Sequence, residues 1–127
     1  MLVPTGWHVS VAGRPPLALI AVARSPVGAD VEPLDDAPPL WDMLTADEAE
    51  QLRAVAQSRQ PEEWLRRWTA KEAHAKRLGY ARSADPAGIE TMPDGPGRLL
   101  ARSREGVSTC WMRMLSGRVE AVALAPG

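Results

Sequence analysis

Three carboxylates and a lysine occur at spacings that would let them act together on a phosphate group. Asp30 and Glu32 stand at positions i and i+2 of a run that is typical of a strand. Side chains alternate across a strand, so these two would point to the same face. Glu72 and Lys76 stand four apart in a run that is typical of a helix, where such residues are neighbours. If the helix packs across the end of the strand, the three carboxylates converge.

Converging carboxylates favour a hard divalent cation. Mg²⁺ prefers oxygen ligands and takes a few carboxylates together with substrate phosphates, while Lys76 would neutralise a phosphate oxygen beside it. Lys71 falls within an apolar stripe of the same helix, where a lysine must extend to solvent or meet an anion. The alternative is an exposed strand end and a solvated Glu72–Lys76 pair worth about 0.2–0.5 kcal/mol. Spacing alone leaves both interpretations open.

The N-terminal part predicts three strands joined by short turns. Residues 7–12 alternate weakly, residues 17–23 form a continuous apolar run typical of a buried strand, and residues 27–32 end in the two carboxylates. A turn is expected at 13–16 and a break at Ser25-Pro26. These three strands would form a β-meander.

Two helices and a second group of strands follow. Thr45 and Glu48 match a capping box, which predicts a helix running to about Ser58. A longer helix should begin at Pro61 and end at Gly79. After a turn-rich stretch, strands are expected at 98–102, 107–115 and 118–125. This order predicts an α+β fold, with an antiparallel sheet packed against a long helix and a shorter helix.

Bulk properties describe an ordinary globular chain. The 127 residues suit one domain over 1–127, with 45% apolar and 24% charged residues and a net charge of −1. No global field would attract nucleic acid or an anionic membrane. No stretch approaches the roughly 20 apolar residues of a membrane helix, and no signal peptide is recognisable. The single Cys110 excludes an internal disulfide and fits a cytoplasmic location. Zinc spacing, a P-loop and a serine triad are not found.

The two segments carry a family resemblance over roughly residues 7–79. They contain the motifs Gly28-x-Asp30-x-Glu32 and Trp68-x-x-Lys71-Glu72-x-x-x-Lys76. This pair of motifs resembles the signature of the 4′-phosphopantetheinyl transferases, and the Lys-Glu-x-x-x-Lys half is quite specific. The resemblance implies transfer of phosphopantetheine from coenzyme A to a serine of an acyl or peptidyl carrier protein.

The resemblance also implies roles for individual residues. Asp30, Glu32 and Glu72 would bind Mg²⁺, and Glu72 would help to deprotonate the carrier serine, directly or through a metal-bound water. Lys76, together with Lys71, would stabilise the pyrophosphate charge as 3′,5′-ADP departs. The underlying physics is positioning and charge neutralisation.

One departure from the family pattern lies in the first strand. Many members carry Ser-His-Ser there, with the histidine near the 3′-phosphate of coenzyme A. The matching positions here begin at Ser10 and lack the histidine, and His8 would lie on the opposite strand face. Ser10 and Arg14 are therefore the candidates for coenzyme A contact in this segment, with Arg14 next to the phosphate.

A second departure is size. The motif spacing resembles the C-terminal half of the two-lobed transferases, in which coenzyme A lies between two similar lobes. A single lobe would need a homo-oligomer, dimer or trimer, or a companion chain. A catalytically impaired subunit that binds coenzyme A or a carrier remains the main alternative, and a plain interaction domain is a third.

Two further expectations concern polar residues outside the motifs. His74 is expected to face solvent. A group of arginines is expected to form either a solvated face or a docking surface for an acidic carrier: Arg66, Arg67, Arg98, Arg102 and Arg104.

Overall fold

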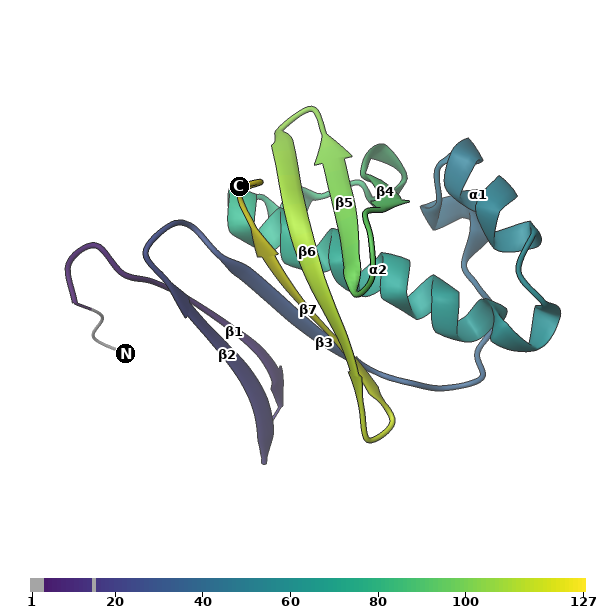
Figure 1. Ribbon diagram of the computed structural model, residues 1–127, viewed down its shortest axis with the longest axis horizontal. Helices are drawn as coiled ribbons and strands as arrows, with labels where there is room; N and C mark the ends of the chain where they lie inside the picture. Colours follow the sequence, from purple (N-terminus) through teal and green to yellow (C-terminus); the bar gives the residue numbers. More distant parts are fainter. Residues whose placement is uncertain (1–3, 15) are drawn as a thin grey trace.

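Two antiparallel sheets and one long helix make up most of the fold (Figure 1). The computed structural model describes residues 4–14 and 16–127, apart from the side chains of Arg14 and Leu17. The larger sheet has the order β3-β7-β6-β5-β4, and the smaller is a hairpin of β1 and β2. The predicted α+β class with antiparallel strands is confirmed.

The first three strands form but do not make a meander. β1 (His8–Arg14) pairs with β2 (Leu17–Ala23), whereas β3 (Gly28–Pro33) pairs with β7 (Arg118–Leu124) at the edge of the larger sheet. The predicted meander is therefore wrong. The chain changes direction at the break before β3. The strand that pairs with β3, β7, lies about ninety positions further along the chain, so the order of neighbouring strands does not indicate this pairing.

The C-terminal strands occur within one residue of the ranges that the sequence predicts. They are β5 (Arg98–Ser103), β6 (Gly106–Leu115) and β7. A short strand that the sequence did not indicate, β4 (Glu90–Pro93), forms the other edge of the sheet within the turn-rich stretch. Four residues ending in proline are too few to show a period, so β4 is recognised only from its pairing with β5.

The first helix, α1 (Ala46–Arg53), begins with the predicted capping box. The Thr45 hydroxyl accepts the Glu48 N–H, and the Glu48 carboxylate accepts the Thr45 N–H. The helix ends at Arg53, short of the predicted Ser58, and the Gln60 side chain donates to the Val55 carbonyl just beyond it. Short 3₁₀ turns lie before and after α1, at Trp41–Met43 and Gln57–Arg59.

The second helix, α2 (Gln60–Leu78), has the predicted proline at its start and ends at Gly79, whose φ of 80° provides the left-handed cap. It lies across one face of the larger sheet (Figure 1). Ala70 and Ala73 are fully buried there against Leu99 and Ala121. In the described residues, no helix combines the length and apolarity that a membrane span requires.

Candidate functional site

β3 and α2 touch through their backbones, and this contact builds the site. A Cβ atom placed at Gly28 would lie 2.5 Å from the Arg77 amide nitrogen and closer still to the Ala73 carbonyl oxygen. Both are backbone atoms that cannot rotate away, so only glycine fits. The glycine of the Gly-x-Asp motif therefore serves to bring the acidic strand against the helix.

Lys76 joins the two motifs directly. Its Nζ donates to the Ala29 carbonyl at 2.9 Å and lies 3.4 Å from Asp30 Oδ1. An ammonium group has three N–H donors, so these contacts leave one for a further acceptor. The side chain keeps 29% of its surface exposed, which leaves the ammonium within reach of a ligand from solvent.

The three carboxylates of the motifs repel one another. Burial, followed by the charge of Glu32, raises the pKa of Asp30 to about 8, with a smaller contribution from Glu72, although the nearby Lys76 ammonium opposes the shift. Burial and the charge of Glu32 likewise raise the pKa of Glu72. One electrostatic cluster thus contains Asp30, Glu32 and Glu72. The single positive charge of Lys76 does not offset the repulsion between these carboxylates.

The cluster fits a cation in its chemistry but is not a closed cage. Asp30 Oδ2 is buried and has no hydrogen-bond partner among the described residues. Within the same residues, no group of three or more His, Cys, Asp or Glu side chains is close enough to hold a metal by itself. Mg²⁺ usually relies on one or two carboxylates plus waters and substrate phosphates, so an open donor set of this kind suits it.

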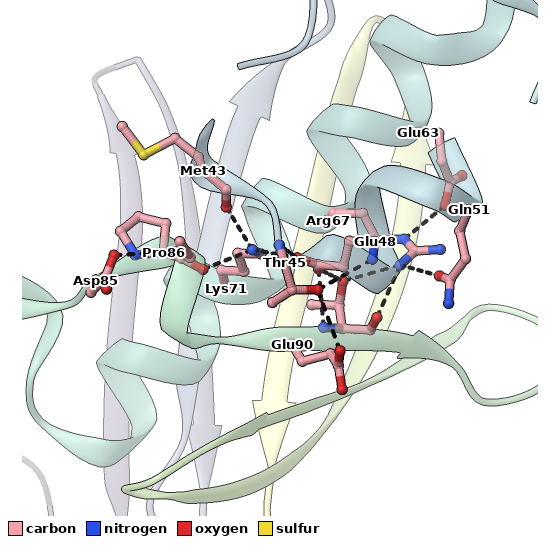
Figure 2. A network of polar contacts seen from close by, with 12 residues as sticks. Met43, Thr45, Glu48, Gln51, Glu63, Arg67, Lys71, Asp85, Pro86 and Glu90 are labelled. Atoms are coloured by element: carbon pink, nitrogen blue, oxygen red, sulfur yellow. Dashed lines mark hydrogen bonds and ion pairs between the residues drawn. The ribbon is translucent and has the colours of Figure 1, made fainter. Parts of the chain in front are cut away.

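Lys71 has a different role from the one implied by the motif. Its Nζ donates to the Met43 carbonyl, to Glu48 Oε1 and to the Pro86 carbonyl, each at 2.7 Å (Figure 2). The residue is 1% exposed, and its three donors are all used. Of the two alternatives for a lysine in this apolar stripe, extension to solvent or contact with an anion, the structure has the second, and the anion is internal. The geometry gives no support to a phosphate contact by Lys71.

A buried polar network surrounds this lysine. Glu48 also accepts the backbone N–H of Thr91 at 3.0 Å and the Thr91 hydroxyl, so it joins α1, α2 and β4. Arg67, 5% exposed, donates to Gln51 and to Thr91 (Figure 2). Arg67 therefore does not belong to a basic surface. The sequence revealed Glu48 only as a helix cap, although the buried lysine required an anion nearby.

His74 is buried, and the prediction that it faces solvent is wrong. It is 0% exposed; its Nδ1 lies 2.7 Å from Ser108 Oγ and its Nε2 lies 2.8 Å from Ser103 Oγ. Burial, then the charge of Arg77, lowers its pKa to about 4, which keeps the ring neutral at physiological pH. The hydroxyls of Ser103 on β5 and Ser108 on β6 provide hydrogen-bond partners for both ring nitrogens. A helical wheel of α2 does not show these partners, because they lie on other elements.

The first strand touches the site through Ser10. Its hydroxyl oxygen accepts the Ala29 N–H at 2.9 Å, next to the carbonyl that Lys76 uses. The Arg14 backbone lies in β1, but the predicted phosphate contact of its side chain falls outside the described residues. His8 is exposed, in agreement with a surface histidine.

Comparison with known proteins agrees with this geometry. A family model described as the 4′-phosphopantetheinyl transferase superfamily matches residues 26–125, a span that contains both motifs and the sheet that positions them. A search of curated proteins found no match. The match supports phosphopantetheine transfer as the general kind of activity. The chain belongs to the 4′-phosphopantetheinyl transferase superfamily.

Proposed function

We propose that this protein transfers 4′-phosphopantetheine from coenzyme A to a serine of an acyl or peptidyl carrier protein, in a Mg²⁺-dependent reaction. The observation that carries the proposal is the Lys76 ammonium, which joins the acidic strand β3 to the last turn of α2. This contact joins Asp30 of the first motif to Lys76 of the second, and it leaves the lysine one N–H donor for a ligand.

Asp30, Glu32 and Glu72 are the residues proposed to hold Mg²⁺. The bound ion would supply positive charge next to the pyrophosphate of coenzyme A. The raised pKa of Asp30 and its unpartnered Oδ2 support this assignment, because a cation relieves both the repulsion and the unsatisfied oxygen. The remaining N–H of Lys76 would bind a phosphate oxygen.

In the proposed reaction, the carrier serine oxygen attacks the β-phosphorus of coenzyme A. The bond between that phosphorus and the bridging oxygen breaks, and 3′,5′-ADP leaves with the electron pair. The serine proton passes to the Glu72 carboxylate, directly or through a water. Lys76 stabilises the negative charge that develops on the departing phosphate.

The assembly proposed for this activity is a homo-oligomer or a complex with a companion chain. The matched span, residues 26–125, provides one lobe, and a two-sided coenzyme A site needs a second surface. We place the protein in the cytoplasm, where carrier proteins and coenzyme A are found together. A buried, unpaired Cys110 is compatible with that location.

Mass spectrometry of an apo carrier protein, incubated with this protein, coenzyme A and Mg²⁺, tests the proposal. A mass gain equal to phosphopantetheine is expected, and it should be lost in Glu72→Gln and on chelation of Mg²⁺. Glu50→Gln, an exposed glutamate on α1, is the matched control and should retain the transfer.

Two outcomes would contradict the proposal. The first is the absence of a mass gain with acyl and peptidyl carriers alike. The second is a gain that Glu72→Gln leaves unchanged. Binding of coenzyme A without turnover would instead identify the catalytically impaired subunit.

A further inference from the structure

The β1–β2 hairpin meets β3 through a side chain and not through a backbone ladder. In the described residues β1 pairs only with β2, and the hairpin lies alongside the edge of β3 that faces away from β7 (Figure 1). The continuous apolar run of β2 predicted a buried strand, but Ile20 and Val22 are 53% and 55% exposed, so only the opposite face of the hairpin packs inward. The half-buried Ser10 lies on that inward face, and its hydroxyl oxygen accepts the Ala29 N–H at 2.9 Å. Within the described part of the chain, no other hydrogen bond joins the hairpin to β3.

Two side chains from different elements hold the backbone of Ala29. The N–H and C=O of one strand residue point to the same edge. At Ala29 the N–H donates to Ser10 of β1, and the C=O accepts the Lys76 ammonium of α2 at 2.9 Å. Ala29 is 0% exposed, so water does not readily replace either partner. Lys76 Nζ also lies 3.4 Å from Asp30 Oδ1, and the direction of the Ala29 carbonyl therefore determines where the ammonium stands beside this carboxylate.

We infer that Ser10 is a positioning residue for Lys76: its hydroxyl fixes the backbone of Ala29, and the Ala29 carbonyl in turn holds the ammonium beside Asp30. This role differs from the coenzyme A contact that the family resemblance implies for Ser10, because it requires no ligand. Its consequence for catalysis rests on the proposed function, in which Lys76 stabilises the departing phosphate. Without the hydroxyl, the Ala29 N–H is buried and unpaired, and β3 must shift to satisfy it. That shift moves the carbonyl away from Lys76.

The two lysines of this chain make the position of Lys76 measurable without a ligand. Lys71 and Lys76 are the only lysines of the sequence. Lys71 is 1% exposed and uses all three of its donors, so an amine reagent reaches it only when the fold opens. The Lys76 side chain is 29% exposed, so its reactivity reports how firmly its ammonium is held. Comparison of the two lysines therefore separates a local change at the site from a general loosening of the fold.

Ser10→Val and Ser10→Thr are a matched pair, because valine and threonine have nearly the same shape and only threonine keeps the hydroxyl. The full chain is acetylated with an N-hydroxysuccinimide ester, without coenzyme A or carrier, and its peptides are analysed by mass spectrometry. Lys76 should react about tenfold faster in Ser10→Val than in the native protein, the factor that corresponds to one lost hydrogen bond. In Ser10→Thr it should react at the native rate, and Lys71 should stay protected in both variants. Thr109→Val is the control, since this half-buried hydroxyl of β6 makes no hydrogen bond among the described residues.

Transfer kinetics of the same variants measure the consequence for catalysis. Ser10→Val should lower kcat about tenfold and leave the KM for coenzyme A unchanged, because a displaced ammonium stabilises the departing phosphate less while ground-state binding is retained. Ser10→Thr should restore the native kcat, and Thr109→Val should not change it.

Any of three results overturns the inference. The first is a native rate of Lys76 acetylation in Ser10→Val. The second is equal acceleration at Lys71 and Lys76, which would make the hydroxyl a general stabiliser of the fold. The third is a raised KM with an unchanged kcat, which would assign Ser10 to coenzyme A contact instead. If the native protein transfers no phosphopantetheine, the proposed function fails, and the acetylation rates still decide whether Ser10 positions Lys76.

Discussion

Replacing Gly28 by alanine should separate the strand and the helix that make the site. The added Cβ would lie 2.5 Å from the Arg77 nitrogen, whereas ordinary van der Waals contact begins at 3.4 Å. β3 and α2 must therefore move apart by about 1 Å or more at this point, since both partners are backbone.

This displacement has consequences for both stability and activity. Overpacking of a tight contact costs about 1–3 kcal/mol, and a backbone contact belongs near the upper end. The bond from Lys76 to the Ala29 carbonyl, 2.9 Å long, would be stretched beyond hydrogen-bonding distance. A misplacement of about 1 Å in a catalytic arrangement can lower the rate about 100-fold. We therefore expect Gly28→Ala to lower the unfolding free energy by about 3 kcal/mol and the transfer rate about 100-fold.

Urea unfolding and the carrier mass assay measure the two effects on the same preparations. Gly88→Ala is the matched control, because a Cβ there meets nothing nearer than Asp85 Oδ2 at 3.6 Å and the φ angle is not left-handed. It should leave both quantities close to the native values. A Gly28→Ala protein with native stability and native transfer rate would refute the close contact of β3 and α2.

The remaining predictions concern buried polar groups of α2 and β6. Lys71→Met should lower the unfolding free energy by about 3–5 kcal/mol, because it leaves the Glu48 carboxylate buried without its ion-pair partner. Lys76→Met should mainly lower the transfer rate, because Lys76 is partly exposed. Equal losses of stability in urea unfolding of the two variants would contradict this difference. The His74 pKa is about 4 when folded and about 6.5 when unfolded. The unfolded state therefore gains the His74 proton first as the pH falls, and this histidine alone should lower native stability by about 2 kcal/mol from pH 7 to pH 5, while Asp30, whose folded pKa of about 8 lies above its unfolded value, contributes in the opposite direction. Between these two pH values the native protein should therefore lose about 2 kcal/mol relative to His74→Gln, and the same pH dependence of stability in both proteins would contradict the assignment. Burial raises the pKa of Cys110 to about 12, so alkylation of this thiol should require unfolding. Rapid labelling of Cys110 in the native protein would contradict this prediction.

Much of the local structure follows from short-range patterns. The capping box at Thr45 and the glycine stop at Gly79 depend on hydrogen bonds and backbone angles within one turn of helix, so a few residues suffice to predict them. The strands β5, β6 and β7 were likewise predicted to within one residue of their bounds, because turn residues separate them in the sequence. The end of α1 at Arg53 lies before the predicted Ser58, because no glycine or proline marks it in the sequence.

The candidate site likewise has one part that local patterns predict and another that depends on contacts between distant segments. Period two along β3 and period 3.6 along α2 place Asp30 with Glu32, and Glu72 with Lys76, whatever the rest of the fold does. The difference between the two motif lysines is not local. Lys71 meets Glu48, twenty-three positions earlier in the chain, and Lys76 meets β3, forty-six positions away. Which lysine serves the core and which serves the site depends on where α1 and β3 pack.

The amino-acid sequence by itself determined the two motifs, their spacing, the helices and most of the strands, because these depend on periodicity and on nearest neighbours along the chain. Only the tertiary structure decided that β3 pairs with β7 and not with β2, that His74 is buried between two serines, and that Val11, Ile20 and Val22 of the hairpin are exposed within the part of the chain that the structure describes. These features arise from contacts between distant segments, whose free energy is gained only when whole elements pack together, and no local pattern records them.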